Sequence, residues 1–197
     1  MLRRDYKLSG PGEFYHIYNR GNEKRNIFRE QTDYEFFIWR LAHNLFPERF
    51  PNKHRTPPLP TKAFSLISYC LMPNHFHLLL KQEKEISPSK LLLRLCTSYS
   101  MYFNKKYKRV GHLFQDQFKA VLIENNPQLM WISAYIHMNA VKDKIVKHPS
   151  EYKWSSYNDF VGKRNLLIVN KEFLIGTFGD VSNFIQQTLI YDVKGHL

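Results

Sequence analysis

The sequence is poor in cysteine, in acidic residues and in long apolar runs. Its 197 residues include only Cys70 and Cys96 as cysteines, without metal-type spacing, which argues against a disulfide framework and fits a reducing compartment. No apolar stretch approaches the length of a membrane span, and the basic N-terminus lacks the apolar segment of a secretory signal. We therefore expect a cytoplasmic protein without a membrane partner.

The shortage of acidic residues leaves a large positive charge. There are 29 lysines and arginines against 17 aspartates and glutamates, which gives a formal net charge of +12. So strong an excess indicates a polyanionic partner, most often nucleic acid. Hydrophobic residues make up 43% of the chain and aromatic residues 15%, which is enough for a real core.

The periodicity of apolar residues predicts an alternation of strands and helices. Strands are expected at 13–21, 63–72, 75–82 and 112–124, and helices at 31–45, 87–107 and 127–146. Thr32 or Asp33 is the expected cap of the first helix, and Pro73-Asn74 the turn of a hairpin. This order predicts an α+β fold with a ferredoxin-like antiparallel sheet and packed helices.

The same pattern divides the chain into a main domain and an appendage. We expect one main domain over 1–147, with a small helical C-terminal appendage over 148–197 packed on it. Residues 47–62 contain five prolines and several basic residues, which predicts an exposed loop without regular structure.

Two histidines stand one residue apart in an apolar run, MPNHFHLLL at 72–80. Alternate residues of a strand share a face, so His75 and His77 point the same way, and two neutral imidazoles at this spacing can share a metal ion. The alternative is a pair of structural histidines held by hydrogen bonds. Two ligands under-coordinate a metal, so the metal interpretation needs a third from elsewhere. On the first strand, His16 either faces the same site or makes a structural hydrogen bond.

The last long helix offers that ligand, in SAYIHMNAVK at 133–142. Tyr135 and Asn139 are four residues apart and share a helix face. Asn139 can present an amide oxygen to a metal ion, which would then lie beside Tyr135. Spacing alone equally allows a half-buried tyrosine and an ordinary asparagine near a helix end. His137 is two positions from each and points elsewhere.

Five segments in order make the chain resemble the single-tyrosine HUH transposases, in particular the REP-associated tyrosine transposases of bacteria. They are FYHIYNRGNEKRNIF, YCLMPNHFHLLL, SYSMYFNKKYKRVGHLFQDQFKA, AYIHMNAVK and EYKWSSY, between about residues 13 and 160. One departure is Gln117, where an arginine is expected in many relatives, and this puts one local DNA contact or packing interaction in doubt.

The resemblance implies a function and a set of roles. His75, His77 and Asn139 match the metal ligands, for Mg²⁺ or Mn²⁺, and Tyr135 matches the nucleophile. The implied reaction is metal-dependent cleavage and strand transfer of single-stranded DNA at hairpin-type sequences through a 5′-phosphotyrosine, by a monomer or a homodimer. Basic residues would hold the DNA: Arg20, Lys24, Arg25, Lys105, Lys106, Lys108, Arg109 and Lys119.

Two other interpretations remain open at the level of the sequence. The first keeps the fold without the reaction, as a nucleic-acid-binding regulator descended from a transposase. The second places Cys70 with His75 and His77 in a structural zinc site, for which no fourth ligand can be found in the sequence.

Overall fold

The fold is built on one antiparallel sheet of four strands. The computed structural model describes residues 10–50 and 57–190. Its strands are β1 (Phe14–Arg20), β2 (Phe64–Met72), β3 (His75–Gln82) and β4 (Lys119–Ile123), in the spatial order β2-β3-β1-β4. Every neighbouring pair is antiparallel, which is the ferredoxin-like arrangement that the sequence predicts.

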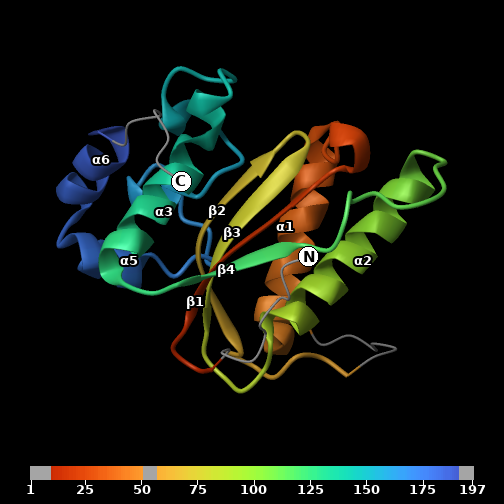
Figure 1. The fold of residues 1–197 in the computed structure, drawn as a ribbon, viewed down its shortest axis with the longest axis horizontal. Helices are drawn as coiled ribbons and strands as arrows, with labels where there is room; N and C mark the ends of the chain where they lie inside the picture. The colour runs from red at the N-terminus through yellow and green to blue at the C-terminus, as the bar shows by residue number, and fades with distance from the viewer. Residues whose placement is uncertain (1–9, 51–56, 191–197) are drawn as a thin grey trace.

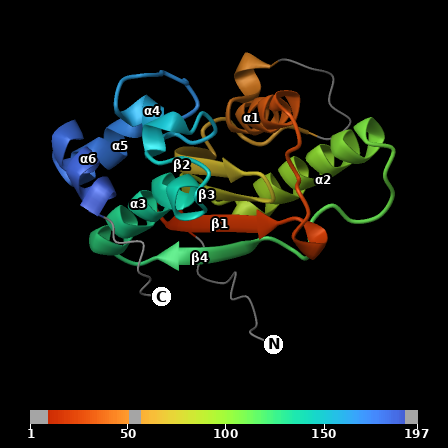
Figure 2. The ribbon, with the colours of Figure 1, turned by 90° about the horizontal axis from the view of Figure 1, so that it is seen from above.

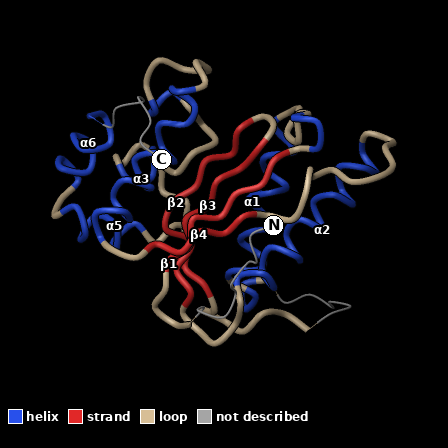
Figure 3. The backbone as a smooth tube through the Cα atoms, viewed as in Figure 1, coloured by secondary structure: helices blue, strands red, loops and turns tan. Residues whose placement is uncertain are grey.

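Helices cover both faces of this sheet (Figures 1 and 3). The helices α1 (Gln31–Leu45) and α2 (Pro88–Lys106) lie on one side, and α3 (Asn126–Lys142) lies on the other with α5 (Lys171–Phe178) and α6 (Val181–Ile190) (Figure 2). None of the described helices is long and apolar enough to cross a membrane. The short α4 (Tyr157–Phe160) and three 3₁₀ turns, η2 (Asn22–Lys24), η3 (Pro47–Arg49) and η4 (Pro149–Glu151), complete the described structure.

The alternation of side chains along β3 divides the interior into two cores. Phe76, Leu78 and Leu80 point into the core under α1 and α2. Leu79 points to the opposite face, into the core that contains the apolar residues of α3. The two histidines of β3 have the same parity as Leu79, so the strand directs them toward α3.

Several local expectations are corrected by the structure. The cap of α1 is Glu30, not Thr32 or Asp33, because Asp33 occupies the third helical position and completes a capping box with Glu30. The fourth strand is shorter than expected, and the segment before it contributes only an isolated bridge between Gly21 and Phe114. The proline-rich stretch 47–62 begins with the turn η3, although residues 51–56 lie outside the described part.

The C-terminal segment runs along the outer edge of β2. The backbone N–H of Leu71 donates to the carbonyl of Trp154 at 2.9 Å, and the N–H of Ser156 donates to the carbonyl of Tyr69 at 3.0 Å. The segment thus satisfies backbone groups that an edge strand would otherwise expose. A division of the chain at residue 147 stays a prediction.

Candidate active site

The two histidines of β3 face the space between the sheet and α3. Their rings lie 5.0 Å apart, nearly perpendicular to each other. His75 lies beside the hairpin turn, and its Nδ1 is 2.6 Å from Oδ1 of Asn74. His77 lies deeper, and its Nδ1 is 2.9 Å from Nε2 of His16 on β1. Each ring is therefore held through Nδ1.

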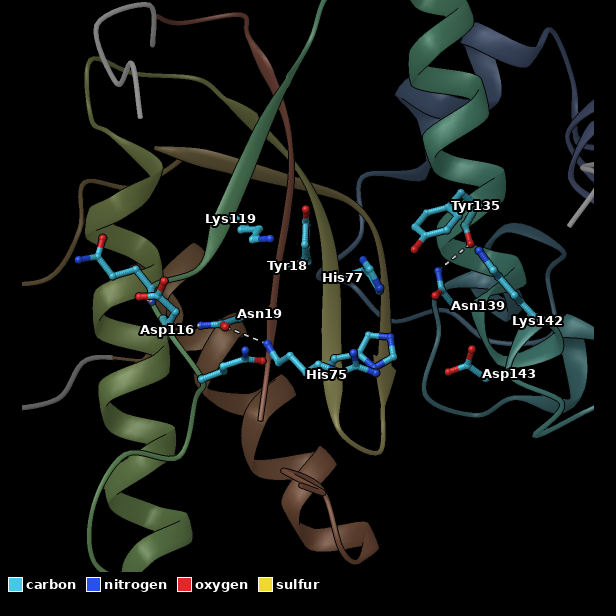
Figure 4. A pocket seen from close by; sticks show the side chains of 13 residues that line it. Tyr18, Asn19, His75, His77, Asp116, Lys119, Tyr135, Asn139, Lys142 and Asp143 are labelled. Atoms are coloured by element: carbon cyan, nitrogen blue, oxygen red, sulfur yellow. Dashed lines mark hydrogen bonds between the residues drawn. The ribbon is translucent and has the colours of Figure 1, made fainter. Parts of the chain in front are cut away.

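The C-terminal half of α3 carries the residues that face these rings. Asn125 caps the helix by accepting a hydrogen bond from the N–H of Gln128 at 2.9 Å, and Pro127 stands in the first turn. A helix started at this point brings Tyr135 and Asn139 to the side that faces the sheet (Figure 4). The ring of Tyr135 meets the ring of His77 edge to face, with the centroids 5.4 Å apart.

Asn139 connects the helix to the histidines. Its Nδ2 donates to the backbone carbonyl of Tyr135 at 2.8 Å. Its side chain also lies close enough to His75 to influence the pKa of that ring. The amide of Asn139 therefore reaches both the helical turn that carries Tyr135 and the strand that carries His75. These three residues meet in one place within one chain.

These side chains line an open pocket of about 510 Å³. The predicted site residues His75, His77, Tyr135 and Asn139 all border it, together with two of the predicted DNA-binding residues, Arg20 and Lys119. Its remaining lining residues are Tyr18, Asn19, Gln115, Asp116, Gln117, Lys142 and Asp143.

Burial shifts the pKa values of the titratable groups in this pocket. The pKa of His75 is lowered to about 4, chiefly by burial. The pKa of His77 is lowered well below 6.5, first by burial and then by its neighbours His16 and His75. Both rings are neutral at pH 7 and can offer lone pairs. The pKa of Tyr135 is raised by burial, and a hydrogen bond with Asn139 partly offsets the rise.

The residues present fit a divalent cation with open coordination positions. Nε2 of His77 is buried and has no hydrogen-bond partner among the residues described, as expected of a ligand atom without its ion. Two imidazoles and an amide oxygen suit Mg²⁺ or Mn²⁺ that completes its shell with phosphate or water oxygens. No group of three or more histidine, cysteine or acidic side chains in the described chain is arranged to hold a metal.

The absence of such a group among the described residues bears on the structural zinc site considered for Cys70, His75 and His77. Cys70 pairs with His77 across the hairpin, yet its thiol is fully buried and contacts the sulfur of Met72 at 3.5 Å. Cys70 does not line the pocket. The geometry therefore gives the zinc interpretation no support.

The remaining predicted DNA-binding residues lie away from this pocket. Lys106 has its ammonium 2.6 Å from a carboxylate oxygen of Glu30 and 2.6 Å from one of Asp33. Lys106 is thus engaged in ion pairs within the folded protein, and this geometry does not favour a contact between Lys106 and DNA. Arg25 pairs with Glu23 at 2.7 Å.

Two of the predicted basic groups meet in space. The pKa of Arg109 is lowered, first by partial burial and then by the neighbouring Arg25 and Arg29. Arg109, which follows α2, therefore lies near Arg25 and Arg29, which follow β1. Lys24, Lys105 and Lys108 are exposed. Their roles in DNA binding stay predictions.

Sequence reasoning missed Lys142, Asp143 and Tyr18, which line the pocket of the predicted site. Lys142 has its ammonium 5.3 Å from the centroid of the Tyr135 ring. Asp143 lies close enough to His75 for its negative charge to raise the pKa of that ring. Both could have been found by continuing the helical face of Tyr135 and Asn139 by one turn. Tyr18 shares strand parity with His16, whose contact with His77 only the sheet register reveals.

Comparison with known proteins agrees with the fold. Residues 55–139, somewhat under half of the chain, match the family described as "Transposase IS200 like". This match confirms the resemblance to these transposases and supports a transposase function. A search of curated proteins found no match.

A solved structure described as a REP-associated tyrosine transposase bound to a REP hairpin is similar in fold. It shares 18% identity with this chain, with 83% of this chain and 86% of that chain covered and a TM-score of 0.60. A putative transposase from Deinococcus radiodurans R1 shares 12% identity over 69% of this chain and 95% of its own. Its TM-score of 0.42 carries no weight for the fold.

Proposed function

We propose that this protein cleaves and rejoins single-stranded DNA through Tyr135, with a divalent metal ion, at hairpin-type sequences. The observation that carries the proposal is the meeting of Tyr135 and Asn139 from α3 with His75 and His77 from β3 in one pocket. Metal-assisted phosphoryl transfer requires a nucleophile beside neutral groups that can bind a metal ion, which here are two imidazoles and one amide.

Tyr135 acts as the nucleophile. Its phenolic oxygen attacks the phosphorus of the scissile phosphodiester and gives up its proton to water in the open pocket. The bond between phosphorus and the 3′ oxygen breaks, and that oxygen takes up a proton and leaves as a 3′-hydroxyl. The 5′ phosphate stays bound to Tyr135. Attack by a different 3′-hydroxyl reverses these steps and joins new strands without an external energy source.

His75, His77 and Asn139 would hold the metal ion, Mg²⁺ or Mn²⁺. Bound there, a divalent ion withdraws charge from the scissile phosphate and orients it for in-line attack. Lys142, with its ammonium 5.3 Å from the centroid of the Tyr135 ring, places a positive charge near the phenolate that forms during the reaction. The hydrogen bond with Asn139 counters part of the rise in the Tyr135 pKa that burial causes.

The charge of the protein supports a DNA substrate. Arg20 and Lys119 border the pocket opposite α3, and the ammonium of Lys119 lies 5.8 Å from the centroid of the Tyr18 ring. Cations beside a half-buried aromatic ring in the pocket lining suit single strands, because the cations contact phosphate while the ring stacks on a base. The fold it shares with a REP-hairpin-bound transposase favours hairpin sequences as the target.

The test is incubation of the protein with labelled single-stranded hairpin DNA and Mn²⁺, followed by a denaturing gel. A covalent protein–DNA band that is lost in Tyr135→Phe supports the proposal. Tyr107→Phe is the matched control, because Tyr107 lies on the far side of the sheet and hydrogen-bonds Asp33. Binding without any covalent band, across several hairpins, would instead support a non-catalytic regulator on the same fold.

A further inference from the structure

His16 is a buried histidine that contacts the candidate metal site from the neighbouring strand. It lies on β1, exposes 6% of its surface, and places Nε2 at 2.9 Å from Nδ1 of His77. The planes of the two rings are 19° apart. Because both side chains project from the face that α3 covers, the contact belongs to the same site and not to the opposite core.

A hydrogen bond between two neutral imidazoles holds a single hydrogen, which admits two arrangements. If Nε2 of His16 donates, the hydrogen of the His77 ring is on its own Nε2, and that atom cannot bind a cation. If Nδ1 of His77 donates, Nε2 of His77 carries a lone pair. Nε2 is the buried atom of His77 that lacks a partner among the described residues.

We propose that His16 is a positioning residue that accepts the hydrogen of His77 Nδ1 and thereby fixes the metal-binding tautomer of His77. The inference rests on the proposed function, because it assigns His77 as a metal ligand. Metal-bound histidines generally donate their second ring N–H to an acceptor that fixes both tautomer and ring orientation. His16 supplies that acceptor from a neighbouring strand.

The other histidine of the pair is held in the same way by a different residue. Nδ1 of His75 donates to Oδ1 of Asn74 at 2.6 Å, and an amide oxygen can only accept. The hydrogen of His75 is therefore on Nδ1, which leaves its Nε2 free for a cation. The site would thus orient both ligands by one rule, with Asn74 as acceptor at the surface and His16 as acceptor in the interior.

The test compares two substitutions at His16. His16→Gln keeps an oxygen acceptor near the position of Nε2, whereas His16→Leu keeps the bulk and removes the acceptor. Mn²⁺ affinity is measured by calorimetry without DNA, and the midpoint of thermal unfolding is recorded for each variant. We expect His16→Leu to weaken Mn²⁺ binding about 10–100-fold, as loss of such an outer partner does, and His16→Gln to restore most of it.

The hydrogen position is read independently by NMR of the ring nitrogens of His77 in the protein saturated with Mg²⁺. Hydrogen on Nδ1 supports the inference, and hydrogen on Nε2 overturns it. Unchanged Mn²⁺ affinity in His16→Leu also overturns it, as does weak binding by a His16→Gln variant that unfolds at the wild-type temperature. If the wild type binds no Mn²⁺ at all, the proposed metal site fails, and the proposed role of His16 fails with it. If the wild type binds Mn²⁺ and only the results for the His16 variants or the His77 tautomer disagree, the role of His16 alone fails.

Discussion

The ring of Tyr135 stands edge to face against the ring of His77, 5.4 Å between centroids, although one lies on α3 and the other on β3. Helix α3 follows β4 and crosses the sheet face that bears the histidines, so its C-terminal half reaches them without a second chain. This relationship brings the nucleophile candidate and the metal-ligand candidates together within one polypeptide.

A complete pocket in one chain predicts that two defective chains cannot complement each other. We expect a mixture of Tyr135→Phe and His75→Ala proteins to form no covalent DNA product, because each intact pocket needs both residues. The measurement is the gel assay with the two variants mixed at equal concentration, with each variant alone as control. Recovered product would mean that a site is assembled from two chains.

Loss of a metal ligand should abolish metal binding and leave the DNA surface intact. For His75→Ala we expect Mn²⁺ affinity to fall by at least about 100-fold, beyond the range for outer partners, since a ligand itself is removed. Hairpin affinity without metal should stay within about twofold, because His75 is neutral at pH 7. The matched control is His112→Ala, at an exposed histidine. Equal loss of Mn²⁺ binding in both variants would remove His75 from the site.

We predict that Lys119 contributes to DNA binding and Lys106 to stability. Lys119→Gln should weaken binding to single-stranded DNA and reduce the slope of log affinity against log salt by about 0.7, the value for one phosphate contact on a single strand. Lys106→Gln should leave that slope unchanged, because Lys106 already pairs with Glu30 and Asp33. The measurement is fluorescence anisotropy over a salt series. The reverse pattern would place the DNA on the α2 side of the sheet.

The partner of Lys106 predicts a dependence of stability on pH. The pKa of Asp33 is lowered, because hydrogen bonds from Lys106, Tyr107 and the backbone of Arg29 and Glu30 outweigh the desolvation that raises it. A carboxyl with a lower pKa in the folded state stabilises the protein above its unfolded pKa of about 4, and this contribution is lost as pH falls below that value.

Asp33→Asn should therefore lower the free energy of unfolding by about 3 kcal/mol at pH 7, the usual cost of breaking a buried ion pair. The difference from the wild type should shrink as pH falls below about 4, because protonation of the unfolded carboxyl then removes the stability that the lower folded pKa contributes. Urea denaturation at pH 7, 5 and 3 measures it, with Asp116→Asn as control at an exposed aspartate. A difference that stays constant or grows toward pH 3 would show that Asp33 is not stabilising as a charged group.

The sequence predicted most of the fold because its local signals agree with each other. Apolar alternation, Pro73-Asn74 and Pro88 locate two of the strands and the start of α2 within a residue or two. The bounds of α1 were predicted correctly, but its cap was predicted wrongly because Thr32 and Asp33 are both good caps, and only the backbone shows that Glu30 holds that position.

The site was predicted only along single elements. Strand parity gave His75 with His77, and helix spacing gave Tyr135 with Asn139. Neither rule relates residues that lie on different elements. The contact of His16 with His77 depends on the pairing register of β1 against β3, and the sequence does not reveal that register. The ion pairs of Lys106 were missed for the same reason, since its carboxylate partners lie at the start of a helix that is distant in the sequence.

The most direct test of the central account is to locate the covalent bond. The protein is reacted with a hairpin substrate and Mn²⁺, digested with protease and nuclease, and examined by tandem mass spectrometry. The account predicts a nucleotide attached through its 5′ phosphate to the peptide that contains Tyr135. Attachment to another residue of the pocket, such as Tyr18, or cleaved DNA without any attached peptide, would contradict it.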